Sequence, residues 1–265
     1  MAERIPAELV SADSMQVYRG LPILTNQDAG ARLVGIWPLD RQGTVGEFQQ
    51  LAHEAIDAIL AAGRTPIVVG GSGLWFQAAL TDVRLPPDVP AGARERWERL
   101  YDRRGAATAH ALLRRRDPRA AARVHANDRK RVVRALELWQ TGATLVPAEP
   151  RLWTAETRVP TLVVGLAVPA ETLARRIRAR AEEMFERGVL EEVRAAAEVA
   201  PGVLGLEAVR ALPREEATEQ LVRDTVRFAA YQRKWMRRIP GIVMIDAERP
   251  AAEVADAILE VARAR

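Results

Sequence analysis

A strand, a capped helix and another strand follow one another between residues 31 and 71, and this order restricts the fold more than any other part of the sequence. Residues 31–39 (ARLVGIWPL) are largely apolar, and residues 65–71 (TPIVVGG) are β-branched and bounded by proline and glycine. Between them, Thr44 and Glu47 form a capping box, apolar residues recur at helical spacing, and Gly63 ends the helix. A unit of this kind predicts parallel strands in an α/β protein.

Three more strands are predicted, and a long stretch without strand signal lies between the third and fourth of the five. In that middle stretch, charged helical patterns replace the apolar runs. The sequence therefore predicts an α/β core, formed by residues 1–93 and 158–265, that is interrupted by a helical insertion over residues 94–157. The additional strands are predicted at residues 8–14 (ELVSADS), 161–168 (TLVVGLAV) and 241–247 (GIVMIDA).

The composition excludes several kinds of site. Cysteine is absent, and the three histidines are scattered, so a disulfide framework, a thiolate nucleophile and a histidine-built metal site are excluded. No apolar stretch approaches the roughly 20 residues that a membrane helix needs. We therefore expect a cytoplasmic protein with no membrane partner.

Arginine dominates the basic residues and points to phosphate-containing partners. Of 39 lysines and arginines, only Lys130 and Lys234 are lysine. The guanidinium group suits planar, bidentate contacts with phosphate. A nucleotide bias of the genome would give the same preference, so the grouping of the arginines has to distinguish phosphate recognition from such a bias.

Asp13 is the first candidate for a functional side chain. It lies at the polar tip of the first predicted strand, between Ser11 and Ser14. In α/β proteins, side chains at the carboxyl ends of strands often carry the chemistry. The alternative is a structural one, in which Asp13 caps the segment that follows.

A glycine-rich turn follows the strand at 65–71. The sequence VVGGSGLW surrounds Ser72 with three glycines, which allow the backbone to approach a ligand closely. An ordinary strand-to-helix turn would have the same composition. Its position after a buried strand favours a loop that contacts substrate.

Basic helix faces supply the remaining candidates. Arg176 and Arg180 lie four residues apart, hence on one face of a helix. After a cap at Asn127 or Asp128, three basic residues lie opposite an apolar stripe, and a helix near the C-terminus repeats this division. Solvated surface faces would look the same. The basic residues after the cap are Lys130, Arg131 and Arg134, and the second stripe of the later helix contains Leu221, Thr225, Phe228, Gln232 and Trp235.

Four blocks of the sequence together resemble the bacterial tRNA dimethylallyltransferases, also called tRNA isopentenyltransferases. They are AELVSADSMQVYRGL, GRTPIVVGGSGLWFQAAL, RVHANDRKRVVRALELWQTG and RIRARAEEMFERGVLEEV, and they occur in order over most of the chain. The resemblance implies a P-loop NTPase/kinase-like parallel sheet with a helical insertion. It implies transfer of a five-carbon group from dimethylallyl diphosphate to the exocyclic amine of the adenosine 3′ of the anticodon in tRNA, with Mg²⁺ as the cofactor.

The resemblance also implies roles for individual residues. Asp13 matches the general base, and Ser14, Met15 and Gln16 would lie near the target nucleotide. Ser72 stands where the family usually has threonine, and Arg180 matches the arginine that clamps the departing diphosphate. Contacts to tRNA are expected from Arg94, Lys130, Arg131 and Arg134.

One departure from the family concerns the start of the chain. Family members usually carry a loop G-x-x-x-x-G-K-[ST] before the Asp13 block, and this chain has no Gly-Lys pair. We therefore expect the first strand and the P-loop to be missing, with no cofactor-binding or metal-binding residues here. Met1 is predicted to be a misassigned start, and the chain as given to be truncated and inactive. The in-frame nucleotide sequence upstream should encode Gly-Lys-Ser or Gly-Lys-Thr within about ten residues, roughly three helical turns; an in-frame stop codon there would refute this.

Two other functions stay open on sequence grounds. A P-loop small-molecule kinase could use the same core, because a fold does not fix a function. A non-catalytic tRNA-binding relative would have lost the phosphate loop. Binding of tRNA separates the enzyme and this relative from the kinase, and release of diphosphate separates the enzyme from the relative.

Overall fold

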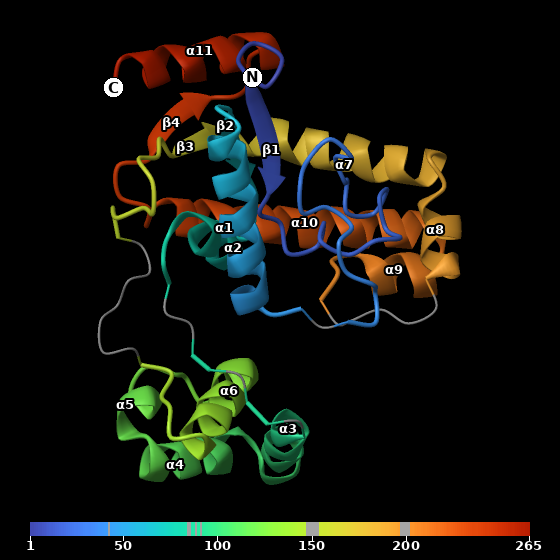
Figure 1. The fold of residues 1–265 in the computed structure, drawn as a ribbon. Helices are drawn as coiled ribbons and strands as arrows, with labels where there is room; N and C mark the ends of the chain where they lie inside the picture. The colour runs from blue at the N-terminus through green and yellow to red at the C-terminus, as the bar shows by residue number, and fades with distance from the viewer. Residues whose placement is uncertain (42, 84–85, 88, 91, 147–153, 197–201) are drawn as a thin grey trace. The chain divides into compact units, whose positions relative to one another are not determined.

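In the computed structural model, the chain forms two compact units. The structure describes residues 1–41, 43–83, 86–87, 89–90, 92–146, 154–196 and 202–265. The larger unit contains residues 1–83 and 153–265, and the smaller one contains residues 84–152 (Figure 1). Among the described residues, no helix is both long and apolar enough to cross a membrane.

The first pair of strands in the larger unit is parallel, as the sequence predicts. β1 (Ala7–Ser11) pairs with β2 (Thr65–Val69), and α1 (Val45–Ala61) precedes β2 along the chain. The capping box of α1 is present: the backbone N–H of Glu47 donates to the Thr44 hydroxyl at 3.2 Å, and the Glu47 carboxylate accepts from the N–H of Thr44 at 2.9 Å. The prediction of an α/β protein with parallel strands is confirmed.

Residues 31–39 do not form the strand that the sequence predicts. Only isolated bridges join Val10 to Arg32 and Tyr18 to Trp37. Leu33 and Gly35 have φ angles of 65° and 60°, and this left-handed backbone interrupts an extended segment. Trp37 of this loop is buried and Leu33, Ile36 and Leu39 are partly buried against the core, which is why the composition of the loop resembles that of a strand.

A second parallel pair and long helices complete the larger unit. β3 (Val164–Ala167) pairs with β4 (Val243–Asp246). The remaining helices of this unit are α2 (Gly73–Leu80), α7 (Ala170–Glu186), α8 (Val189–Ala195), α9 (Leu206–Ala211), α10 (Arg214–Met236) and α11 (Ala251–Arg263).

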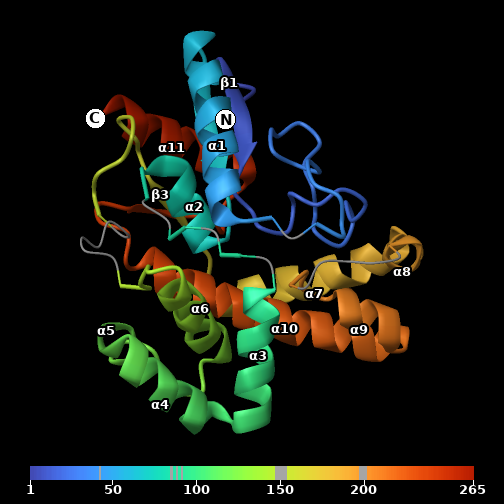
Figure 2. The same cartoon turned by 60° about the horizontal axis from the view of Figure 1, so that its bottom comes forward.

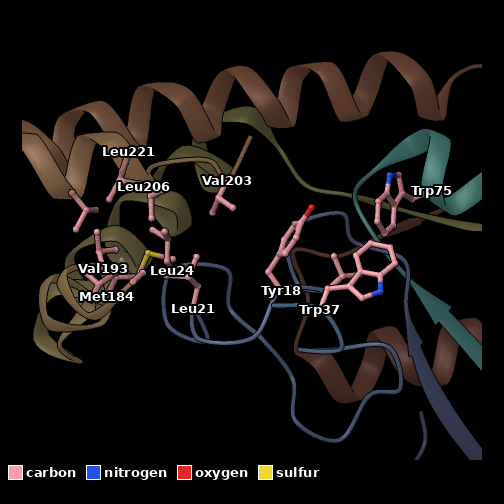
Figure 3. Close-up of a cluster of buried hydrophobic side chains, with 14 of the residues drawn as sticks. Tyr18, Leu21, Leu24, Trp37, Trp75, Met184, Val193, Val203, Leu206 and Leu221 are labelled. Atoms are coloured by element: carbon pink, nitrogen blue, oxygen red, sulfur yellow. The ribbon is translucent and has the colours of Figure 1, made fainter. Parts of the chain in front are cut away.

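The main core of this unit joins the loop after β1 to α7 and α10 (Figure 3). At one end, Trp37 packs edge-on against Trp75 with ring centroids 5.9 Å apart, and Phe48 lies 4.3 Å from Trp75. At the other end, Leu24 of the loop is buried with Met184 of α7. Burial of these side chains fixes the loop that carries Asp13.

The smaller unit is helical. It consists of α3 (Ala93–Arg104), α4 (Ala106–Arg116), α5 (Pro118–Ala121) and α6 (Arg129–Gln140), and Figure 2 shows these helices from a second direction. Its core is formed by residues such as Leu113, Val132 and Leu136. The predicted insertion, 94–157, shares residues 94–152 with this unit.

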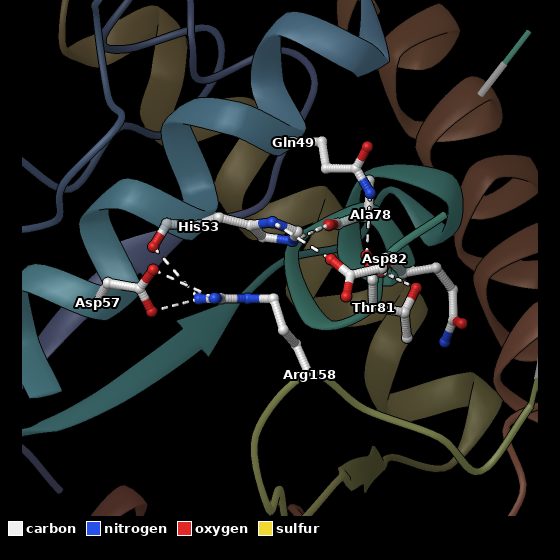
Figure 4. Close-up of polar contacts among 8 residues, drawn as sticks. Gln49, His53, Asp57, Ala78, Thr81, Asp82 and Arg158 are labelled. Atoms are coloured by element: carbon white, nitrogen blue, oxygen red, sulfur yellow. Dashed lines mark hydrogen bonds and ion pairs between the residues drawn. The ribbon is translucent and has the colours of Figure 1, made fainter. Parts of the chain in front are cut away.

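The chain leaves and re-enters the larger unit at neighbouring points of its backbone (Figure 4). The N–H of Arg158 donates to the carbonyl of Leu80 at 2.8 Å. The Arg158 guanidinium pairs with Asp57 of α1, with one bond of 3.1 Å, and the Gln49 amide donates to the carbonyl of Thr81 at 2.9 Å. Both crossings of the chain are therefore tied to α1.

Candidate functional site

Asp13 follows the end of β1 and closes a turn with its carboxylate. Its Oδ1 accepts a hydrogen bond from the N–H of Met15 at 2.8 Å, and the residues after it form a turn and not a helix. Burial raises the pKa of Asp13 above its usual range, and this effect exceeds the opposing effects of the Met15 and Gln16 N–H groups and of Arg180. A carboxylate with a raised pKa at a strand end is suited to accepting a proton.

A cavity of about 240 Å³ lies beside Asp13. Its polar wall includes Asp13, Gln232 and Arg180. Apolar side chains from the loop after β1 and from α7 and α10, such as Leu24, Met184 and Phe228, form an apolar part of the lining. The stripe predicted on the later helix contributes Leu221, Thr225, Phe228 and Gln232 to this lining.

Ser72 and Ser14 meet at the rim of β1 and β2. Their hydroxyl oxygens lie 2.9 Å apart, and the Ser14 N–H donates to the Ser72 hydroxyl at 3.2 Å. Ser72 occupies the N-cap position of α2, but its side chain makes no capping hydrogen bond to that helix. The hydroxyl is therefore directed to the residue next to Asp13.

The glycines beside Ser72 permit two close approaches. A Cβ at Gly70 would lie 2.4 Å from the carbonyl oxygen of Ala12, which is backbone. A Cβ at Gly71 would lie 2.0 Å from Nε2 of Gln232, the end of a flexible side chain that donates to the Gly71 carbonyl at 3.1 Å. Gly70 thus allows the turn to pack directly against the backbone that leads into Asp13.

The two candidate arginines of α7, Arg176 and Arg180, have different surroundings. Arg176 donates to the carbonyl of Ala247 at 3.1 Å and so ties α7 to the end of β4. Arg180 lines the cavity with an exposed side chain whose guanidinium is partly desolvated; this desolvation lowers its pKa, whereas Asp13 raises it. Of the two, only Arg180 is placed to act on a ligand in the cavity.

Met15 and Gln16 both line the cavity. The Gln16 amide also makes hydrogen bonds within the protein. Its Oε1 accepts from the Ser11 hydroxyl at 2.8 Å, and its Nε2 donates to the carbonyl of Asn26 at 2.8 Å. Gln16 therefore supports the loop that carries Asn26.

Glu192 is a supporting residue that the sequence did not reveal. Its carboxylate accepts hydrogen bonds from the N–H groups of Ile23 and Leu24, each at 2.8 Å. Leu24 lines the cavity, so Glu192 fixes one wall of it. No local sequence signal could have identified this contact, because Glu192 lies 168 residues from Leu24 along the chain.

Most of the basic residues predicted for RNA contact in the smaller unit already have acidic partners. Arg94 and Arg134 each donate to Glu137 at 3.2 Å, and the Glu137 side chain is only 1% exposed. Arg131 lies 3.5 Å from Asp128, which caps α6. Lys130 is exposed, and among the described residues it has no acidic partner.

Comparison with known proteins decides the family. The family model described as IPP transferase matches residues 16–239. The chain belongs to the IPP transferase family. The matched region contains Gln16, Ser72 and Arg180 and all of the smaller unit.

Several relatives are similar to this chain over most of their own lengths. The tRNA dimethylallyltransferase of Frankia alni is 38% identical, with 93% of this chain and 90% of that protein covered. The tRNA dimethylallyltransferase of Corynebacterium jeikeium is 36% identical, with coverages of 94% and 86%. Among solved structures, the full-length tRNA isopentenylpyrophosphate transferase of Bacillus halodurans is 27% identical with a TM-score of 0.65, and covers 98% of this chain and 89% of its own.

The buried Glu137 carboxylate leads to a prediction about the stability of the smaller unit. Arg134→Met should destabilise the smaller unit by about 1–3 kcal/mol, because it removes one of the two arginines that satisfy the buried Glu137. Urea denaturation would measure the loss. Lys130→Ala is the control and should leave the free energy of unfolding within about 0.5 kcal/mol of the parent. Equal stability of the two variants would contradict a structural role for Arg134.

Proposed function

We propose that this protein transfers the dimethylallyl group of dimethylallyl diphosphate to the exocyclic amine of the adenosine 3′ of the anticodon in tRNA. The observation that carries the proposal is one cavity lined by the Asp13 carboxylate, the Arg180 guanidinium and an apolar wall. Acceptor, leaving group and isoprenoid tail need these three environments. The names of the related transferases agree with it.

Asp13 serves as the general base in this proposal. An adenine amine is a poor nucleophile because its lone pair is delocalised into the ring, so removal of a proton during bond formation assists attack. A positioned base typically contributes about 10²- to 10⁴-fold. The raised pKa of Asp13 brings its basicity closer to what proton transfer near neutral pH requires.

Arg180 and the apolar wall act on the donor. The carbon–oxygen bond to the diphosphate breaks as the carbon–nitrogen bond forms, and the negative charge that develops on the diphosphate is stabilised by the guanidinium. Residues such as Met15, Ile177 and Phe228 line the cavity and offer the tail an apolar surface. Ser72 and Ser14, which are hydrogen-bonded to each other beside Asp13, are proposed to contact the substrate.

A P-loop kinase-like core and Mg²⁺ belong to the same proposal. The two parallel strand pairs and the helices between them support such a core. Among the described residues, no three acidic or histidine side chains form a cluster that could hold a metal ion. These residues do not build a Mg²⁺ site by themselves, and a bound Mg²⁺ would supply positive charge to the diphosphate leaving group.

A transfer assay tests the function. Dimethylallyl diphosphate is incubated with a tRNA transcript that carries adenosine 3′ of the anticodon, or guanosine there as a control, and the digested nucleosides are analysed by mass spectrometry. The assay uses this chain. We expect dimethylallyladenosine from the first transcript only.

Two results would redirect the assignment. Binding of tRNA without transfer of the dimethylallyl group would favour the non-catalytic relative. Phosphorylation of a small molecule by ATP, without any affinity for tRNA, would favour the kinase.

A further inference from the structure

Two groups among the basic residues of the smaller unit differ in their surroundings. In the first group, acidic partners neutralise the charge: Arg129 is held by Asp102 and Glu98 of α3, and these partners raise its pKa. Arg94, Arg131 and Arg134 are paired as described above. The second group lies at the end of α4 and around α5; we call it the arginine corner, and it consists of Arg114, Arg115, Arg116, Arg119 and Arg123.

The arginine corner is exposed and has almost no acidic residues near it in the sequence. All five side chains are exposed, and none has an acidic partner among the described residues. Between Arg103 and Asn127 the only acidic residue is Asp117. Asp117 is buried, and its carboxylate is used by the N–H of Ala120 at 2.9 Å and the hydroxyl of Thr144 at 2.6 Å. Asp117 is therefore not free to compensate the positive charge of the corner, and no other acidic side chain among the described residues pairs with it.

One arginine of the corner is also oriented by an aromatic ring. The guanidinium carbon of Arg116 lies 4.5 Å from the centroid of the Trp139 ring. Stacking of this kind holds the guanidinium plane while its N–H groups at the edge remain free to donate. Such an arrangement is suited to bidentate contact with a phosphate.

We propose that the arginine corner binds the phosphate backbone of RNA and supplies most of the electrostatic attraction between the smaller unit and tRNA. The proposal rests on the proposed function, and it moves the main RNA contact away from the basic residues of α6. Exposed, uncompensated arginines gain more from a phosphate than arginines that must first leave a carboxylate. Arginines at a helix end could also serve only solubility and the helix dipole, which gives the alternative to test.

The test replaces three arginines in each of two places. The first variant carries Arg114→Gln, Arg115→Gln and Arg119→Gln; Arg116 is left because it packs on Trp139. The matched control carries Arg99→Gln, Arg103→Gln and Arg104→Gln on α3, where Glu95, Glu98 and Asp102 share the helix. Both change the net charge equally, and all six side chains are exposed.

Affinity for a tRNA transcript is measured by filter binding over a range of salt concentrations. The corner variant should bind roughly tenfold more weakly or worse at low salt, and its slope of log K against log salt should fall by about one unit per arginine. The control should stay within about twofold of the parent. Replacing the same corner residues with lysine should restore most of the salt slope, since the charge returns.

Two outcomes would overturn the proposal. If both glutamine variants lose affinity equally, only the net charge matters; if the corner variant binds like the parent, the surface belongs to another partner or to none. Failure of the proposed function looks different, because the parent chain itself would then show no affinity for tRNA.

Discussion

Asp13→Asn is expected to lower the rate of dimethylallyl transfer by roughly two orders of magnitude or more, while tRNA affinity stays nearly unchanged. The asparagine keeps the size of the side chain and an oxygen that can accept from the Met15 N–H, so the turn survives. It cannot accept the proton of the adenine amine. Single-turnover transfer gives the rate, and filter binding gives the affinity. A rate near that of the parent would remove Asp13 from the role of base.

Asp13→Asn should increase the stability of the folded chain near neutral pH, although it lowers the transfer rate. Burial raises the pKa of Asp13, so the charged form is disfavoured in the folded chain, and this penalty applies at pH values above the raised pKa. The penalty disappears as the pH falls through that pKa. Asp13→Asn should therefore raise the melting temperature near neutral pH, and the gain should vanish in acid. A lower melting temperature at neutral pH would show that the hydrogen bonds to the carboxylate outweigh its burial.

The pH dependence of transfer gives an independent check on Asp13. The base works only when deprotonated, so the rate should fall as the pH drops through a pKa above the ordinary aspartate value of about 3.9. Arg180 lowers the pKa of Asp13, so Arg180→Gln should move this acidic limb to higher pH while also slowing the reaction. An unchanged limb would mean that another group controls the pH dependence.

Gly70→Ala should have the second largest effect, on both folding and transfer. The new Cβ would lie 2.4 Å from the Ala12 carbonyl oxygen and 2.7 Å from its carbon, so backbone has to move on one side or the other. We expect a loss of at least about 2 kcal/mol in the free energy of unfolding. Asp13 follows Ala12 directly, and a shift of about 1 Å in a catalytic group can lower the rate roughly 10²-fold. Chemical denaturation and single-turnover transfer measure the two effects.

Gly71→Ala is the control for that prediction. Its Cβ meets the amide of Gln232, which can turn away, at the loss of one hydrogen bond worth about 1 kcal/mol. The variant should therefore fold with a smaller penalty than Gly70→Ala. Equal losses in the two variants would show that the whole turn, and not the contact with Ala12, sets the requirement for glycine.

Local signals explain the parts of the fold that could be predicted. The capping box at Thr44 and Glu47 and the β-branched run of β2 act within a few residues, and both are present. The failure at residues 31–39 has a conformational cause, because the φ angle of Leu33 is not visible in its apolar composition. A pattern of burial can thus be read from sequence more reliably than the backbone path that achieves it.

The part of the candidate site that lies at the ends of strands was predictable from local sequence. Asp13 and Ser72 follow β1 and β2, which are parallel neighbours, so the two segments meet. Glu192 joins the site through hydrogen bonds across the tertiary structure, and Glu137 engages Arg94 and Arg134, which were both predicted to contact RNA. Such pairings depend on which helices pack together, and this information is not contained in the spacing of one helix.

The hydrogen bond between Leu80 and Arg158 has a consequence for how such chains diversify. The outgoing and returning segments of the chain are both hydrogen-bonded to α1. The helices between them therefore form an inserted module with adjacent ends. Such a module can be lengthened, shortened or exchanged without rerouting the core that holds Asp13. The helical module and the core can then evolve at separate rates within one gene.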